Sequence, residues 1–265
     1  MAFADLPGVF APLLADPGTA GVFTDFDGTL APIVDVPDQA TPLPGVRGVL
    51  DDLSERLATV AVISGRPVAF IQRWLDGPRV VISGLYGLEM AIGDERLDHP
   101  RIGAWREAVD DVVAAAGADG PGEMFVENKG VSVTLHYREH PEAAPAVLAW
   151  ARRQAERSGL ELRSARMSVE LHPPVGTDKG AVLATMASQL RSACFIGDDI
   201  GDLPAFAALD RLREEQGLSV AKVVVRSSEL PAEVAAVADV VVEGPEAALA
   251  LLEQLSRALA RSSTQ

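Results

Sequence analysis

The chain has 265 residues, of which 48% are hydrophobic and 23% are charged, a composition that excludes disorder of the whole chain and leaves room for a sizeable core. The formal net charge of −15 argues against a general nucleic-acid binder, because that class needs a basic face toward the phosphates. The one cysteine, Cys194, excludes an internal disulfide framework, and its apolar neighbours predict a small buried residue.

The first residues and the length of the apolar runs bear on location. The N-terminal stretch carries Asp5 and Asp16 and lacks the basic start of a secretory signal. No apolar run approaches the roughly 20 residues that a membrane span needs. We therefore expect a cytoplasmic protein with no membrane or nucleic-acid partner, acting as a monomer without an obligate protein partner.

Short β-rich runs alternate with amphipathic helical runs along both ends of the chain, which predicts an α/β fold with a parallel sheet and helices on both faces. Strands are expected, in chain order, at residues 21–26 (ending at Asp25), 59–63, 79–83, 193–196, 220–225 and 239–242. Helices are expected at residues 45–57, 67–75, 181–190 and 203–209.

The middle of the chain has a different order of elements. Helices are expected at residues 105–116 and 144–158, and strand pairs at 124–127 with 131–137 and at 160–164 with 168–172. This helix–hairpin–helix–hairpin unit of roughly 75 residues is large enough to be a small α+β domain. We place it at residues 99–173, inserted into a discontinuous core domain of residues 1–98 and 174–265.

Three polar motifs follow expected strands, and a fourth opens an expected helix. Asp25 and Asp27 form an acid pair before a glycine, Ser64 follows the second strand with Arg66 two residues later, and Lys179 opens a helix. In an open α/β sheet ligands bind outside the carboxyl ends of the strands, so these groups fit a phosphate site. Taken singly, each also fits an ordinary role, as a polar turn, a helix cap or a surface lysine.

The fourth motif is a cluster of carboxylates, Asp198, Asp199 and Asp202, after an apolar strand. Like charges this close repel one another unless a cation lies among them, and hard oxygen ligands near a phosphate suit Mg²⁺. A polar loop that caps the next helix is the plainer alternative.

The four motifs in this order resemble those of the haloacid dehalogenase superfamily of phosphohydrolases, over the whole predicted core. The resemblance implies a Rossmann-like core in which Asp25 is the nucleophile and forms an aspartyl-phosphate. It implies that Asp27 protonates the leaving oxygen and later activates water, while Ser64 and Lys179 neutralise the phosphoryl charge.

The same resemblance implies a magnesium site. Asp25, the backbone carbonyl of Asp27 and Asp198 would hold the Mg²⁺ ion. Asp199 and Asp202 would support it, either by holding metal-bound water or by positioning Lys179.

Strand alternation in the inserted unit places polar side chains on one face. Its members, by period-two alternation, are Ser132, Thr134, His136 and Arg138. Glu127, Lys129 and Glu170 add charged hydrogen-bonding groups, and such a set suits a polyol, where each hydroxyl needs a partner. A satisfied histidine, solvated hairpin residues and a cross-strand ion pair are the ordinary alternatives.

The E-x-K-x-x-S-x-x-x-H-Y-R stretch from Glu127 and the E-x-x-P segment before D-K-G resemble the trehalose-6-phosphate phosphatase family. This resemblance implies hydrolysis of trehalose 6-phosphate in trehalose biosynthesis, with a specificity cap that binds the sugar. The implied substrate-binding residues are Arg66, Glu127, Lys129, His136 and Glu170. The sequence departs from the usual family pattern at Tyr86, Arg166, Gly201 and Leu203.

Three other functions stay open on the sequence. The first two are related capped phosphatases, acting on mannosyl-3-phosphoglycerate or on sucrose phosphate. The third is a non-catalytic module that binds a sugar phosphate, although such a module has no need of a nucleophile.

Overall fold

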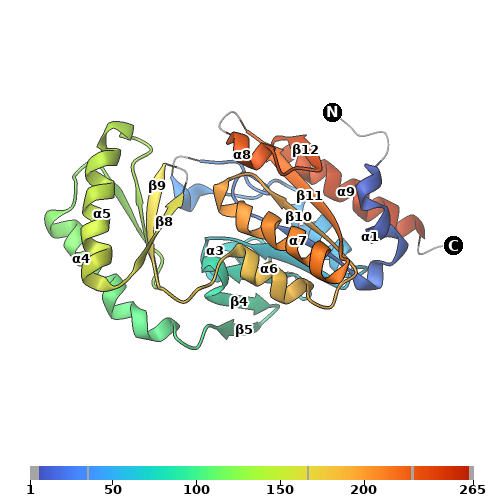
Figure 1. The fold of residues 1–265 in the computed structure, drawn as a ribbon, viewed down its shortest axis with the longest axis horizontal. Helices are drawn as coiled ribbons and strands as arrows, with labels where there is room; N and C mark the ends of the chain where they lie inside the picture. Colours follow the sequence, from blue (N-terminus) through green and yellow to red (C-terminus); the bar gives the residue numbers. More distant parts are fainter. Residues whose placement is uncertain (1–5, 35, 166, 228–229, 263–265) are drawn as a thin grey trace. The chain divides into compact units, whose positions relative to one another are not determined.

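The computed structural model describes residues 6–34, 36–165, 167–227 and 230–262. The chain divides into two compact units, unit 1 (Met1–Leu97 and Thr177–Gln265) and unit 2 (Asp98–Gly176), the second inserted into the first (Figure 1). The insertion predicted at residues 99–173 has nearly these limits. Arg166, one of the departures from the family pattern, lies outside the described residues.

Unit 1 is built on one eight-stranded sheet. In spatial order its strands are β12 (Val240–Glu243), β11 (Ser219–Arg226), β10 (Ser192–Gly197), β1 (Ala20–Thr24), β2 (Thr59–Ile63), β3 (Val81–Gly84), β4 (Glu89–Ile92) and β5 (Glu95–Asp98). The six strands from β12 to β3 are parallel, and β1 lies at their centre, with Thr24 opposite Ile196 of β10. The predicted α/β fold class is confirmed.

Helices cover both faces of this sheet because its strands are apolar on both sides. One face packs against α1 (Ala11–Ala15), α2 (Val46–Ser54), α3 (Val68–Ile71) and α9 (Gly244–Ser262), and the other against α6 (Lys179–Ala187), α7 (Leu203–Gln216) and α8 (Ala232–Ala235).

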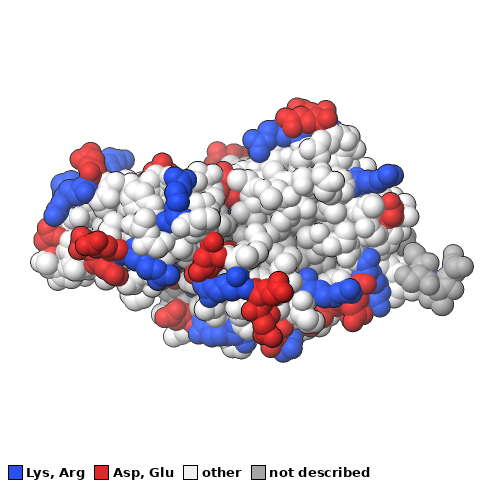
Figure 2. Space-filling model, turned by 90° about the horizontal axis from the view of Figure 1, so that it is seen from below, with Lys and Arg blue, Asp and Glu red and all other residues white. Residues whose placement is uncertain are grey.

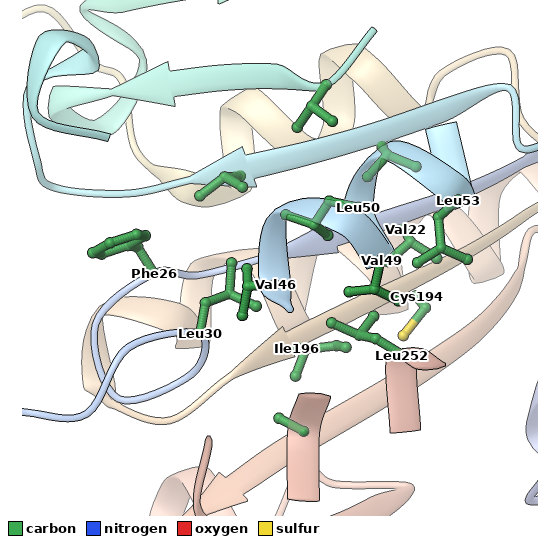
Figure 3. Packing of buried hydrophobic residues seen from close by; sticks show 14 of the residues in the cluster. Val22, Phe26, Leu30, Val46, Val49, Leu50, Leu53, Cys194, Ile196 and Leu252 are labelled. Carbon is green, nitrogen blue, oxygen red and sulfur yellow. The ribbon is translucent and has the colours of Figure 1, made fainter. Parts of the chain in front are cut away.

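Figure 3 shows the first of these layers, where apolar side chains of α2 and Leu252 of α9 meet Val22, Cys194 and Ile196 of the sheet. Cys194 is buried as predicted, and burial raises the pKa of its thiol. Short 3₁₀ turns complete the unit: Gly8–Phe10, Pro17–Thr19, Pro37–Gln39, Leu85–Gly87 and Ile200–Asp202.

Several elements of unit 1 differ from the expectation: α1, β4, β5, α8 and α9 are absent from the predicted elements, and α3 is shorter than predicted. β4 runs antiparallel to β3, so the sheet is mixed, and β4 and the edge strand β5 are short runs that lack the apolar signal of a central strand. The helix expected at residues 67–75 ends at Ile71. Arg73 Nε donates to the Phe70 carbonyl at 3.2 Å, and the Trp74 amide, which would bond that oxygen in a continuing helix, donates to Ile71 instead.

Unit 2 is a four-stranded antiparallel sheet with helices on one face. The strand order is β6 (Phe125–Asn128), β7 (Val133–His136), β9 (Ser168–His172) and β8 (Glu161–Ala165), and the helices are α4 (Arg106–Asp119) and α5 (Ala144–Ser158), with 3₁₀ turns at Ile102–Trp105 and Pro141–Ala143. Val133, Leu135 and Trp150 belong to the core between sheet and helices. The opposite face of β7 is therefore the polar face predicted from alternation.

Charged side chains of both signs are interspersed on the face of the molecule in Figure 2. Some of the exposed acidic groups form ion pairs with basic ones, such as Arg47–Asp76 at 2.8 Å and Arg226–Glu243 at 3.2 Å. Such pairs are each worth about 0–1 kcal/mol, so they contribute to solubility more than to stability. In the described part of the chain no helix is long and apolar enough to cross a membrane.

Candidate active site

The loop after the central strand β1 brings the first acid pair to the edge of the sheet. The Asp25 amide continues the ladder by donating to the Ile196 carbonyl at 2.8 Å, and the chain then turns through Gly28 (φ +77°). A side chain at Gly28 would collide with the carboxylate of Asp198, so only glycine lets the two acidic loops approach this closely.

Three buried carboxylates gather where β1 and β10 end. Asp25, Asp198 and Asp202 each offer an oxygen within 4.8 Å of the others, and none is more than 5% exposed. Burial raises the pKa of Asp25 well above its usual range, Asp202, Asp199 and Asp27 raise it further, and Lys179 works in the opposite direction. A divalent cation among these oxygens would remove most of this cost, so the donor set fits Mg²⁺.

Lys179, the first residue of α6, lies inside this cluster. Its Nζ is 2.8 Å from Asp25 Oδ1 and donates to Asp202 Oδ1 at 2.6 Å. Burial by itself lowers the pKa of the ammonium, but Asp202 and Asp25 outweigh it, so the pKa is raised well above its ordinary value and the lysine is charged. The sequence alternative of a solvated surface lysine does not fit a side chain that is 4% exposed.

Asp202 and Asp199 organise the acidic loop after β10. Asp202 Oδ2 accepts from the amides of Asp198 (2.8 Å) and Asp199 (3.2 Å), and its other oxygen is held by Lys179. Asp199 Oδ1 accepts from the Gly201 amide at 2.7 Å and caps the following turn. Both oxygens of Asp202 are thus engaged, which leaves Asp25 and Asp198 as the better metal ligands.

Arg66 lies against the second acid of the pair. Its Nε and Nη2 each donate to an oxygen of Asp27 at 2.8 Å, its Nη1 donates to the Pro37 carbonyl at 2.8 Å, and its guanidinium stacks on Phe70. A bidentate contact of this kind fixes the carboxylate in orientation as well as in place. Arg66 thus contacts Asp27 in the structure, and its predicted contact with the substrate stays a prediction.

Ser64 is buried at the end of β2, and its hydroxyl accepts from the Arg66 amide at 3.1 Å. The helix that follows begins only at Val68, and the Val68 amide donates to Glu89 Oε2 at 2.9 Å. The amide of the first helical residue is therefore taken by a carboxylate of the chain itself.

A left-handed turn follows β3. Leu85 (φ +50°) and Tyr86 (φ +56°) precede Gly87 (φ +95°), and a left-handed conformation costs a residue with a side chain about 1–2 kcal/mol. The turn places the phenol of Tyr86 against Gly65: a Cβ added to that glycine would lie 2.7 Å from the Tyr86 hydroxyl oxygen. Sequence reasoning noted Tyr86 only as a departure from a pattern, because nothing in the residue types predicts this turn.

The polar face of unit 2 has buried charges at its centre. Glu170 on β9 is 1% exposed, and its Oε1 accepts from the Ser132 hydroxyl at 2.5 Å. Lys129 Nζ is 3.5 Å from Glu170 Oε2, and this lysine side chain is 8% exposed. Lys129 is thus a buried partner of Glu170 and not a solvated hairpin residue.

A second pair lies along the same face. Glu127 on β6 and His136 on β7 are in contact through Oε2 and Nε2 at 2.8 Å. Phe125, two residues before Glu127, is 52% exposed and lies beside the His136 ring, with ring centroids 5.8 Å apart. An exposed aromatic beside carboxylates and an imidazole adds an apolar surface to the face, and the sequence analysis did not single it out.

The predicted residues form two groups. Unit 1 brings together Asp25, Asp27, Ser64, Arg66, Lys179, Asp198, Asp199 and Asp202. Unit 2 brings together Glu127, Lys129, His136 and Glu170 on one sheet face. The first group has the charges for phosphate and a divalent cation, and the second has the donors and acceptors for a polyol.

Unit 1, with acids at the carboxyl end of its central strands, has the fold of solved haloacid dehalogenase-like proteins. A haloacid dehalogenase-like hydrolase from Bacteroides thetaiotaomicron has a similar structure (TM-score 0.60, 15% identity, 91% of this chain and 98% of that chain covered). The C-terminal domain of Candida albicans trehalose-6-phosphate phosphatase has a TM-score of 0.75 at 21% identity, over 97% of this chain and 99% of that one.

The chain belongs to the trehalose-phosphatase family, whose model matches residues 23–238. A trehalose-phosphate phosphatase of Mycobacterium ulcerans (strain Agy99) is 34% identical over 199 residues, which are 71% of this chain and 51% of that protein. The chain thus spans about half the length of the curated relatives it matches. The C-terminal domain of the Candida albicans trehalose synthase regulatory protein also has a similar fold (TM-score 0.65, 14% identity, 94% of this chain and 98% of that chain covered).

Proposed function

We propose that the protein is a Mg²⁺-dependent phosphatase that hydrolyses trehalose 6-phosphate to trehalose and phosphate. The observation that carries the proposal is the buried Asp25 carboxylate, held 2.8 Å from Lys179 at the edge of the sheet, in a chain of this family. A binding module has no need of a nucleophile, whereas this carboxylate is kept in place although burial raises its pKa well above the usual range, against the opposite effect of Lys179.

The proposed reaction has two steps, the formation of an aspartyl-phosphate and its hydrolysis. Asp25 attacks the phosphorus, the bond from phosphorus to the sugar oxygen breaks, and Asp27 gives that oxygen a proton. Asp27 then takes a proton from water, which attacks the phosphorus of the aspartyl-phosphate, so phosphate leaves and the Asp25 carboxylate is restored. Arg66 holds the ionised Asp27 carboxylate in one orientation, which suits the second step, in which Asp27 takes a proton from water.

Charge neutralisation accompanies both steps. Lys179 lies beside the attacking carboxylate, Ser64 follows the neighbouring strand β2, and we expect both to bind oxygens of the phosphoryl group. Asp25, Asp198 and the Asp27 backbone carbonyl would hold Mg²⁺, with Asp199 and Asp202 in support. When bound, the ion supplies the positive charge that lets an anionic carboxylate approach an anionic phosphate.

Unit 2 would recognise the sugar. Glu127, Lys129, His136 and Glu170 offer charged donors and acceptors on one face, and hydrogen bonds to charged groups are the stronger ones. We keep the cytoplasmic location and the monomeric state as predictions.

A substrate panel tests the proposed activity. Phosphate release is measured with Mg²⁺ on trehalose 6-phosphate, sucrose 6-phosphate, mannosyl-3-phosphoglycerate and glucose 6-phosphate. We expect the highest kcat/KM with trehalose 6-phosphate. A higher value with another sugar phosphate would move the specificity to that compound, and binding without turnover of any would point to a non-catalytic module.

Mg²⁺ is expected to raise the thermal unfolding midpoint of the protein and to be required for turnover. A ligand that binds only the folded state at 100 times its Kd adds about 2.7 kcal/mol. The shift should vanish in Asp198→Asn and remain in Asp210→Asn, whose carboxylate lies on α7 beside Lys222. Full turnover after exhaustive removal of divalent cations with EDTA would contradict the metal requirement.

Glu170→Gln is expected to raise the KM for trehalose 6-phosphate about tenfold or more, because it removes one charged partner of a sugar hydroxyl. Hydrolysis of p-nitrophenyl phosphate, which has no sugar, should be unchanged. The matched control is Glu161→Gln on β8, an exposed glutamate in the same sheet. A lower unfolding midpoint with an unchanged KM would mean that Glu170 only stabilises the sheet through Ser132 and Lys129.

A further inference from the structure

The left-handed turn Leu85–Gly87 is fixed to two segments of the candidate phosphate site. The Leu85 amide donates to the Arg66 carbonyl at 3.0 Å, and the Tyr86 amide donates to the Ser64 carbonyl at 3.1 Å. On its other side the turn packs on α6, the helix that Lys179 opens: a Cβ at Gly87 would lie 2.5 Å from a methyl group of Val182. The turn thus lies between the segment of Ser64 and the helix of Lys179.

The phenol of Tyr86 lies beside the segment that follows Ser64. Its ring and hydroxyl cover Gly65, the residue after Ser64, at distances that leave no space for a side chain there. The phenol also lies close enough to Lys179 to interact with it electrostatically. Tyr86 as a whole residue is partly exposed.

The backbone of the turn is unfavourable for both residues that carry side chains. Glycine would adopt these positive φ values without strain, yet the chain has leucine and tyrosine there. Strain of this kind persists only where the surrounding structure holds it, and it is concentrated at functional sites. The strained turn sets the direction in which the Tyr86 side chain points.

We infer that Tyr86 is a further residue of the phosphoryl site, whose phenolic hydroxyl donates a hydrogen bond to a non-bridging oxygen of the bound phosphoryl group. The hydroxyl adds an uncharged donor to the charged ammonium group of Lys179. The inference rests on the proposed function only in that a phosphoryl group binds beside Asp25. It does not depend on which sugar is the leaving group.

The test is Tyr86→Phe, which removes the hydroxyl and keeps the ring. The affinity for inorganic phosphate should fall about 10- to 100-fold, the effect of one hydrogen bond to a charged acceptor. The kcat/KM values for p-nitrophenyl phosphate and trehalose 6-phosphate should fall by the same factor, with an unchanged unfolding midpoint. The control is Tyr137→Phe, the chain's other tyrosine, which packs on the core of unit 2 and should have no effect.

Two further results separate the possible failures. If Tyr86→Phe binds inorganic phosphate as tightly as the unaltered protein, the inference is overturned, whatever the substrate. If the unaltered protein hydrolyses no trehalose 6-phosphate, the proposed function fails, while the phosphate affinities still decide the role of Tyr86. In Gly65→Ala the added methyl displaces the phenol, so phosphate affinity should fall as in Tyr86→Phe, and the double variant should lose little more.

Discussion

Asp25→Asn is expected to reduce hydrolysis of every phosphate ester by at least about 10⁴-fold, the scale on which loss of a nucleophile acts in other enzymes. The amide cannot attack phosphorus, whereas the buried loop keeps its shape because the two side chains are isosteric. Rapid acid quenching followed by mass spectrometry should detect a phosphorylated chain in the unaltered protein and none in the variant.

The control for this prediction is Asp52→Asn, an exposed aspartate on α2, which should have full activity. Turnover of Asp25→Asn within a hundredfold of the unaltered protein would exclude Asp25 as the nucleophile.

Stability gives a second readout for Asp25→Asn. The pKa of Asp25 is raised in the folded state by burial, so the folded protein holds this proton to a higher pH than the unfolded chain. Without a divalent cation, the free energy of unfolding should therefore decrease as the pH rises from the ordinary pKa through the raised one. The asparagine variant should lack this decrease, which urea unfolding over a pH series would show.

Lys179→Met is expected to lower the free energy of unfolding by about 3–5 kcal/mol as well as abolishing turnover. Its removal leaves Asp25 and Asp202 buried without their common cation, and breaking a buried pair by losing one partner is strongly destabilising. The double variant Lys179→Met/Asp202→Asn should recover part of this loss, because one of the uncompensated charges is gone. Denaturant unfolding measures both values.

The chain offers a matched control in Lys222→Met. Lys222 is also buried, and its Nζ is 2.9 and 3.0 Å from the two oxygens of Asp210. The Asp210 side chain is 32% exposed, so water can hydrate it once the lysine is lost. We expect a smaller loss of stability than in Lys179→Met and unchanged turnover. Equal losses in the free energy of unfolding would mean that the carboxylates around Lys179 depend on the lysine charge no more than Asp210 depends on that of Lys222.

The fold and the core motifs were predictable because they rest on local patterns. The apolar runs of β1, β2 and β10 end at Asp25, Ser64 and Asp198, and parallel strands bring such ends to one edge of the sheet. The polar face of unit 2 follows in the same way from the alternation of strand β7. In each case sequence spacing alone decides which side chains share a face.

The features that escaped prediction depend on tertiary contacts. The left-handed turn at Tyr86 opposes the preference of its own residues and is held by the carbonyls of Ser64 and Arg66. The pairing of Arg66 with Asp27 joins loops far apart in the sequence. α3 ends at Ile71, and beyond it Arg73 donates to a carbonyl of the same helix, a contact that no propensity scale contains.

The position of β1 constrains the order in which the protein can fold during synthesis. One neighbour of this strand, β2, follows it closely in the chain, but the other, β10, follows the whole of unit 2. A ribosome adds about 5–20 residues per second, so the nascent chain spends seconds with the central strand open on one side. During that interval Asp25 has already been synthesised, whereas β10 and Lys179, which later lie beside it, have not. Unit 2 is fully synthesised before the sheet of unit 1 can close.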